Sequence, residues 1–299
     1  MKSVLVTGST GLIGSACVRR FAADGFRVLA AARSVAKAEA MFGGMESVEV
    51  VRWDVTQPAG FEIGAVDYLI HAASETSSRA FVEDPSGIRR VIVEGTRNVL
   101  DFARWTQVKS MVYLSTFEVM LGLTGVRASY PDAKLAAEEL CRASGINVSI
   151  ARLAQTFGEG VRYDDGRVFA EFARAILEKR DIVLKTEGTT ARCYCYLGDA
   201  IEAIRVLLEK GVRGEAYLVA NEDTYCTIRE MAEMLIAAHP ESGSKLVIDT
   251  AGAESRGFAP PFQMKLDSSP LRALSWQPKV GLIEMYDRMM TGMMLNVKI

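Results

Sequence analysis

Val4-Leu-Val-Thr-Gly8-Ser-Thr-Gly11-Leu-Ile-Gly14 joins a short apolar run to three spaced glycines, and a helical pattern continues from residue 12 to residue 23. A strand that turns into a helix through such glycines is typical of a dinucleotide site. The first glycine permits the turn, the second lets the backbone approach a pyrophosphate, and the third lets helix and strand pack closely. A purely structural turn is the alternative. Because the helix N-terminus faces the phosphates, we predict a cofactor loop that consists of Gly8, Thr10, Gly11, Leu12, Ile13 and Gly14.

Apolar strand patterns alternate with helical patterns through the first half of the chain. We expect strands at residues 26–32, 48–53, 66–71, 109–115 and 147–153, and long helices at residues 87–105 and 131–144. This alternation predicts parallel strands with helices on both faces. The predicted fold class is therefore α/β, a Rossmann-type doubly wound parallel sheet, and ligands are expected beyond the carboxyl ends of its strands.

The pattern becomes irregular after about residue 155. Helices are expected at residues 167–179, 197–210 and 227–238, and short strands at residues 182–185 and 216–219. We interpret residues 1–154 as an NAD(P)-binding Rossmann domain and residues 155–299 as a smaller C-terminal α/β substrate-binding region. No clean linker separates them, so the boundary is soft and the chain can cross back over it.

Composition limits the classes of partner. The chain has 299 residues and a net charge of −2, so no strong field attracts nucleic acid or an anionic membrane. No apolar run is long enough to span a membrane, and the first residues lack the layout of a signal peptide. Five irregularly spaced cysteines and only two histidines predict reduced thiols, a cytoplasmic location and no metal site.

The end of the second predicted strand bears on the choice of cofactor. An acidic residue there would bind the ribose 2′-hydroxyl and favour NAD. The strand instead ends Ala30-Ala-Ala-Arg33, and Arg33 can pair with a 2′-phosphate. This charge favours NADP, with NAD still open. Arg33 stacked on the adenine, or facing water, is the alternative.

Two further strand ends are expected beside the cofactor. Asp54 and Val55 follow the third strand, where Asp54 can bind the adenine or serve as an ordinary turn residue. Ala72 and Ala73 follow the fourth strand, and their small side chains let the backbone lie against the cofactor. We interpret His71, just before them, as a structural imidazole.

Tyr130 and Lys134 form the sharpest candidate for catalysis. Residues four apart on a helix share one face, so the Lys134 ammonium is expected to stabilise a tyrosinate and lower the phenol pKa. Tyr130 then exchanges a proton with an alcohol while a hydride moves to or from a nicotinamide. Thr116, which ends the fifth strand, is expected to hold the same oxygen.

With these residues in place, the chain resembles the extended short-chain dehydrogenase/reductase family, and within it the NAD-dependent epimerase/dehydratase group that modifies nucleotide sugars. The matching segments extend almost from end to end. They are Thr7-Gly-Ser-Thr-Gly-Leu-Ile-Gly14, His71-Ala-Ala73, Gly95-Thr-Arg-Asn98, Ser115-Thr116, Tyr130-Pro-Asp-Ala-Lys-Leu-Ala-Ala-Glu138, Ala151-Arg-Leu-Ala-Gln-Thr-Phe-Gly158, Arg192-Cys-Tyr-Cys-Tyr-Leu-Gly-Asp199 and Leu271-Arg-Ala-Leu-Ser-Trp-Gln-Pro278.

The resemblance implies a triad of Thr116, Tyr130 and Lys134 that oxidises a sugar 4-hydroxyl to a ketone. The ketone enables epimerisation, loss of water or loss of a carboxylate, after which the hydride returns. Dehydratases carry an Asp before the Glu, whereas this chain has Phe117 before Glu118, as the motif of UDP-glucuronate decarboxylases allows. A decarboxylase-like or epimerase reaction is therefore expected. The resemblance also implies substrate contacts from Ser74, Glu118, Arg167 and Arg192.

Departures from the family keep other functions open. Met120-Leu121 replaces the usual Tyr-Gly, and the segment before Tyr130 is short. Together with Arg33, these departures favour as an alternative an NADPH-dependent reductase of a keto-sugar or small carbonyl. A cofactor-binding sensor without catalysis is a third hypothesis. By resemblance, the helices at 87–105 and 131–144 predict a homodimer.

Overall fold

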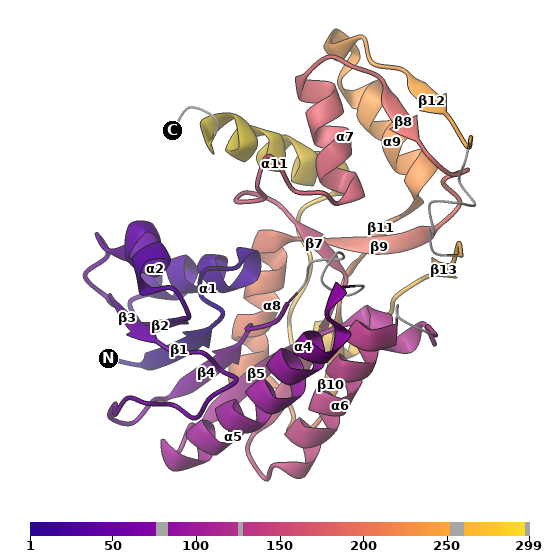
Figure 1. The fold of residues 1–299 in the computed structure, drawn as a ribbon. Helices are drawn as coiled ribbons and strands as arrows, with labels where there is room; N and C mark the ends of the chain where they lie inside the picture. Colours follow the sequence, from indigo (N-terminus) through magenta and orange to yellow (C-terminus); the bar gives the residue numbers. More distant parts are fainter. Residues whose placement is uncertain (76–82, 125–127, 252–259, 297–299) are drawn as a thin grey trace. The chain divides into compact units, whose positions relative to one another are not determined.

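The computed structural model describes residues 1–75, 83–124, 128–251 and 260–296 (Figure 1). The chain clusters into two compact units. The first consists of Met1–Leu153, Ile201–Val219 and Pro270–Trp276, and the second of Ala154–Ala200, Ala220–Ser269 and Gln277–Ile299. The first long segment of the first unit ends at Leu153, and two later segments return to this unit.

The first unit is built on a seven-stranded parallel sheet, which confirms the predicted fold class. The strand order is β10-β6-β5-β4-β1-β2-β3. The strands are β1 (Ser3–Thr7), β2 (Arg27–Ala32), β3 (Val48–Arg52), β4 (Tyr68–His71), β5 (Ser110–Thr116), β6 (Val148–Leu153) and β10 (Ala216–Val219). The order reverses between β1 and β4, and doubly wound sheets bind their ligands at such a reversal.

Helices cover both faces of this sheet. They are α1 (Leu12–Ala23), α2 (Val35–Phe42), α4 (Pro85–Arg89), α5 (Gly95–Trp105), α6 (Ser129–Ala143) and α8 (Leu197–Lys210). Figure 1 shows α4, α5 and α6 together on one face and α1, α2 and α8 on the other. An ion pair of 3.1 Å between Arg20 of α1 and Glu202 of α8 joins two helices of the second group.

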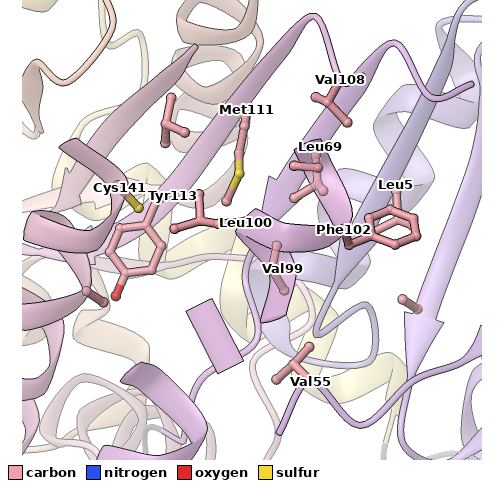
Figure 2. Packing of buried hydrophobic residues seen from close by; sticks show 14 of the residues in the cluster. Leu5, Val55, Leu69, Val99, Leu100, Phe102, Val108, Met111, Tyr113 and Cys141 are labelled. Atoms are coloured by element: carbon pink, nitrogen blue, oxygen red, sulfur yellow. The ribbon is translucent and has the colours of Figure 1, made fainter. Parts of the chain in front are cut away.

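The core beneath α5 and α6 is a cluster of buried apolar side chains. Leu69 and Met111 lie on the neighbouring strands β4 and β5, and Leu100 and Phe102 reach them from α5 (Figure 2). Cys141 of α6 belongs to the same cluster. All five cysteines are free and buried. Burial of this face fixes both helices on the sheet, because apolar surface removed from water contributes about 25 cal/mol per Å².

The expected continuous helix over residues 87–105 is interrupted. A π-helical turn, Arg90–Glu94, separates α4 from α5. The turn contains the β-branched run Val91-Ile-Val93, and the Thr96 hydroxyl donates to the Ile92 carbonyl at 2.6 Å. β-Branched residues and hydroxyl back-bonding both weaken regular helix, which accounts for the wider turn at this place.

The second unit contains a four-stranded sheet, in which β11, β7 and β13 all pair with β9, and a two-stranded sheet of β8 and β12. The strands are β7 (Gln155–Phe157), β8 (Ile182–Leu184), β9 (Ala191–Tyr196), β11 (Asn221–Thr227), β12 (Leu246–Ile248) and β13 (Gln263–Met264). The main helices of this unit are α7 (Val168–Leu177), α9 (Ile228–Ala238) and α11 (Leu282–Asn296). The short α10 (Ser269–Arg272) falls almost entirely in the first unit, which includes Pro270–Trp276. Within the described ranges, no helix is both long and apolar enough to cross a membrane.

Candidate active site

The glycine turn has the geometry of a nucleotide loop. Gly8 has φ +65°, and a Cβ there would lie 2.7 Å from the Ala73 backbone. A Cβ on Gly14 would lie 2.2 Å from the Gly8 carbonyl oxygen, so the third glycine permits the close packing of α1 on the turn. Gly11 is exposed and caps α1 without a side-chain acceptor. The free N–H groups of this helix terminus fit a pyrophosphate.

The other residues of the predicted loop border this turn. Thr10, Leu12 and Ile13 are half-buried at the start of α1. At the end of β4, Ala72 and Ala73 are also half-buried, and the Ala73 N–H donates to the Thr7 hydroxyl at 3.3 Å. The backbone of β4 is thereby tied to the end of β1, the two strands at which the sheet order reverses.

Arg33, at the end of β2, is exposed and has no ion pair within the part of the chain that the structure describes. Asp54 acts as a turn residue, since its carboxylate accepts from the Thr56 N–H at 3.0 Å and from the Thr56 hydroxyl at 2.8 Å. Val55 is buried against Gly95, and its carbonyl accepts from Asn98 at 2.8 Å. The side chains of Asp54 and Val55 therefore have protein partners, whereas Arg33 can reach a ligand.

His71 is a structural imidazole, as its context suggested. Its Nδ1 lies 2.8 Å from the Thr7 hydroxyl and its Nε2 lies 3.1 Å from the Thr96 hydroxyl. Burial, with a smaller effect from Lys134, lowers its pKa to about 3. The ring is therefore neutral and fully engaged at physiological pH.

Lys134 is anchored to the end of β5. Its ammonium donates to the Leu114 carbonyl at 2.7 Å and lies 5.0 Å from the centre of the Tyr113 ring and 5.8 Å from that of Tyr130. The side chain is 3% exposed. Burial lowers the pKa of Lys134 to about 7, so both protonation states are populated near neutral pH.

Tyr130 differs from the sequence-based expectation in the direction of its pKa shift. We expected the Lys134 ammonium to lower the phenol pKa. In the structure burial raises the pKa of Tyr130, the Glu118 carboxylate raises it further, and a hydrogen bond with Ser74 opposes them. The physical reason is that the ammonium is committed to the Leu114 carbonyl, while the phenol is desolvated beside a carboxylate.

Thr116 and Glu118 are linked through a short 3₁₀ turn, η2 (Phe117–Met120). The Glu118 N–H donates to the Thr116 hydroxyl at 3.2 Å, which caps the turn. Phe117 is 2% exposed and belongs to the core. The structure therefore places Ser74, Glu118 and Lys134 around Tyr130, with Thr116 adjoining through Glu118.

One residue of this region was not predicted. Glu138 lies four residues after Lys134 on α6, is fully buried, and accepts from the Ser115 hydroxyl at 2.6 Å. A glutamate on a helix usually faces water, so the residue type alone gave no sign that this side chain is buried. The available signal was spacing, because Tyr130, Lys134 and Glu138 share one helical face.

Arg167 and Arg192 belong to the second unit. Arg167 precedes α7, pairs with Asp165 at 2.6 Å and lies over the Phe169 ring at 4.7 Å. Arg192, in β9, lies over the Phe262 ring at 5.1 Å. Its buried Nε has no hydrogen-bond partner among the residues described.

Comparison with known sequences gives a consistent picture. The profile described as "NAD dependent epimerase/dehydratase family" matches residues 4–220. UDP-glucuronic acid decarboxylase 6 of Arabidopsis thaliana is 29% identical over 312 residues, covering 94% of this chain and 85% of that protein. UDP-glucuronic acid decarboxylase 1 of Danio rerio is 26% identical over 256 residues, covering 78% and 60%.

Solved structures show the same fold. The UDP-glucuronic acid 4-epimerase of Bacillus cereus, in complex with UDP-glucuronic acid and NAD, superposes with a TM-score of 0.81 at 19% identity, over 98% of this chain and 99% of that chain. The dTDP-glucose 4,6-dehydratase DesIV of Streptomyces venezuelae, with NAD and TYD bound, gives 0.80 at 22% identity, over 99% and 98%.

Proposed function

The chain belongs to the NAD dependent epimerase/dehydratase family, and from this premise we propose that it oxidises a hydroxyl of a nucleotide-linked sugar and returns the hydride after decarboxylation or epimerisation. A uronic acid linked to a nucleoside diphosphate is the substrate class that fits best, since the relatives named above are UDP-glucuronic acid decarboxylases. The observation that carries this proposal is the cluster of Ser74, Glu118 and Lys134 around Tyr130.

The cofactor site is the glycine turn. A dinucleotide pyrophosphate fits this turn, because Gly8 and Gly14 let the backbone segments of the turn pack closely and the N-terminus of α1 has no side-chain cap. When bound, the nicotinamide accepts and returns a hydride. NAD is present in the structures of B. cereus epimerase and DesIV.

Each side chain of this cluster has its own role in proton transfer. Tyr130 is protonated in the free protein because its pKa is raised, so it takes the proton of the reacting hydroxyl as its own proton passes to the neighbouring Glu118 carboxylate. Ser74 holds the phenol by a hydrogen bond, and Lys134 supplies positive charge nearby. Thr116 holds the sugar oxygen. Once the sugar carries a ketone, the neighbouring C–H and C–carboxylate bonds are weakened, and Glu118 stands beside Tyr130 to exchange a proton there.

Phe117 argues against dehydration. Loss of water needs a proton donor for the departing hydroxyl, and the side chain just before Glu118 is a buried phenyl ring. We therefore favour decarboxylation or epimerisation over elimination of water.

The test is product analysis. The purified protein is incubated with NAD and one nucleotide sugar at a time: UDP-glucuronic acid, UDP-glucose or dTDP-glucose. The masses of the products are then measured by mass spectrometry. Loss of carbon dioxide identifies a decarboxylase, and an unchanged mass with altered stereochemistry identifies an epimerase. Cofactor binding without turnover of any sugar would reject the proposal in favour of a sensor.

A second candidate function rests on Arg33. An exposed guanidinium at the end of β2, without an ion pair among the described residues, suits the 2′-phosphate of NADPH. A reductase of a keto-sugar or small carbonyl would consume NADPH in proportion to product, whereas a hydride-returning enzyme leaves the cofactor unchanged. Absorbance of the reduced cofactor during turnover separates the two.

A homodimer and a cytoplasmic location remain proposals. Trp105 at the end of α5 and Leu135 on α6 are 58% and 40% exposed, and these two helices contact each other. A second copy that covers them would account for this exposure.

A further inference from the structure

Glu138 is a fully buried carboxylate on the face of α6 that also carries Tyr130 and Lys134. The three residues follow one another at intervals of four, so their side chains lie along one side of the helix. Glu138 is 0% exposed. Because a charge withdrawn from water is costly unless it is paired and hydrogen-bonded, the partners of this carboxylate are informative.

Glu138 joins α6 to two strands of the sheet. Its carboxylate accepts from Arg152 Nε at 2.9 Å and Nη2 at 2.6 Å, and from Arg142 Nη2 at 2.9 Å. It also accepts from the Ser115 hydroxyl at 2.6 Å. Ser115 of β5 and Arg152 of β6 are register partners, so their side chains lie on the same face and meet the same carboxylate.

Three successive residues at the end of β5 are fixed in this way. The Leu114 carbonyl accepts from Lys134, the Ser115 hydroxyl donates to Glu138, and the Thr116 hydroxyl accepts from the Glu118 N–H. The first two contacts attach adjacent strand residues to α6 one helical turn apart.

We propose that Glu138 is a positioning residue, which through the Ser115 hydroxyl holds the carboxyl end of β5 in register with α6 and so fixes Thr116 and the Leu114–Lys134 contact relative to Tyr130. The effect of Glu138 on catalysis rests on the proposed function, whereas the effect of Glu138 on the titration of Lys134 does not.

The charges around Lys134 support this role. The groups that face the ammonium are the Tyr113 ring of β5, the Tyr130 ring and Cys141 thiol of α6, and the His71 imidazole of β4, together with Glu138. Burial raises the pKa of Cys141 to about 12, and that of both tyrosines lies above the usual value, so these groups are neutral at pH 7.

Glu138 therefore supplies the negative charge that acts on Lys134. Hydrogen bonds from Arg152, Ser115 and Arg142 outweigh burial and keep the pKa of Glu138 below its usual value, so the carboxylate is ionised. Burial lowers the pKa of Lys134, and Cys141 and Glu138 both raise it, but of these two groups Glu138 is the one that carries a charge at pH 7. Removal of the carboxylate must lower that pKa.

Glu139 provides a matched control. It is the next residue on α6, and its carboxylate also pairs with Arg142, at 2.6 Å. Its side chain is 68% exposed. Glu139→Gln therefore removes a neighbouring charge without removing the contact to β5.

The kinetic experiment measures Glu138→Gln, Ser115→Ala and the double variant that combines these two changes, with Glu139→Gln as the control. Rates are expressed per folded molecule, and the folded fraction is measured by circular dichroism. We expect each single change to lower kcat between about 10-fold and 100-fold with little change in KM, the range for a small misplacement of reacting groups. Because both residues act through one contact, the double variant should be no slower than the slower single variant. Glu139→Gln should stay within about twofold. Multiplied losses, or wild-type kcat in both single variants, would overturn the proposal.

The second arm needs no substrate. The Lys134 ε-carbon is titrated by NMR in protein with ¹³C-labelled lysine, with Lys134→Met identifying the resonance. We expect Lys134 to titrate at lower pH in Glu138→Gln and unchanged in Glu139→Gln. Equal titration in all three proteins overturns the proposal. If the wild-type protein turns over no nucleotide sugar while Lys134 shifts as expected, the proposed function has failed and the role of Glu138 stands.

Discussion

At the scale of single residues, the two side chains at the centre of the site are both pushed away from their charged forms. Burial lowers the pKa of Lys134 to about 7 and raises that of Tyr130. The site therefore stores an electrostatic cost in the folded protein. Shifted pKa values of this kind are common at catalytic centres, and here burial makes Lys134, though not Tyr130, titrate near neutral pH.

Tyr130→Phe tests the phenol directly. We expect kcat/KM for the nucleotide sugar to fall about 10²- to 10⁴-fold, the contribution of a positioned acid–base group. NAD binding, followed by quenching of tryptophan fluorescence, should persist. Tyr163→Phe is the control, because that hydroxyl pairs with Glu178 at the surface. Full activity in Tyr130→Phe would refute the assignment.

Lys134→Met tests the cost of burying the ammonium. The pKa of Lys134 is lower in the folded than in the unfolded protein, so the unfolded state binds more protons between about pH 7 and pH 10.5. Wild-type stability gains from this group as pH rises through that window. The free energy of unfolding of Lys134→Met should therefore exceed that of the wild type by most at or below pH 7. Urea unfolding at pH 6.5 and pH 9.5 measures the difference, and Lys37→Met, at an exposed site, should show none.

Arg33→Ala tests the choice of cofactor. If the guanidinium binds a 2′-phosphate, the Kd for NADP should rise at least tenfold while that for NAD changes little, because a charge-assisted hydrogen bond is worth about 1.5–3 kcal/mol. Isothermal titration calorimetry with NADP and with NAD measures both Kd values. Equal Kd values for NADP in the variant and the wild type would remove the argument for NADP.

At the scale of secondary-structure elements, the turn between β1 and α1 is the most constrained. A methyl group at Gly14 would lie 2.2 Å from the Gly8 carbonyl oxygen, so α1 would have to move away from the strand. We expect Gly14→Ala to cost about 1–3 kcal/mol in the free energy of unfolding and to abolish detectable NAD binding. Gly64→Ala, where a Cβ meets no atom within 4 Å, should leave both unchanged. Retained NAD affinity in Gly14→Ala would show that the loop is not the cofactor site.

Elements with strong local patterns were predictable, and their interruptions were not. Residues 216–219 were expected as a strand and form β10, but their pairing with residues 150–153 of β6 depends on chain contacts that no local pattern encodes. The π-helical turn Arg90–Glu94 lies inside a pattern that reads as one helix. Glu138 was overlooked for the same reason, because Arg152, which neutralises it, comes from a different element.

At the scale of the whole molecule, the exposed Trp105 and Leu135 bear on assembly. If a second copy covers them, the protein should elute as a dimer of 32.6 kDa chains. The double variant Trp105→Lys/Leu135→Lys should then be monomeric, because two charges would be buried without partners. Light scattering after size exclusion gives the mass. Exposed Met294→Lys is the control, and a double variant that remains dimeric would exclude this surface.

The first unit consists of three separate segments of the chain, and this has a consequence for synthesis on the ribosome. The N-terminal segment ends with β6, and its outer partner, β10, is synthesised only after about sixty further residues, most of which belong to the second unit. During that interval the hydrogen-bonding edge of β6 is open to any other extended chain. Nascent chains of this protein should therefore be most vulnerable to aggregation, and most dependent on chaperones, between the release of residue 153 and that of residue 219.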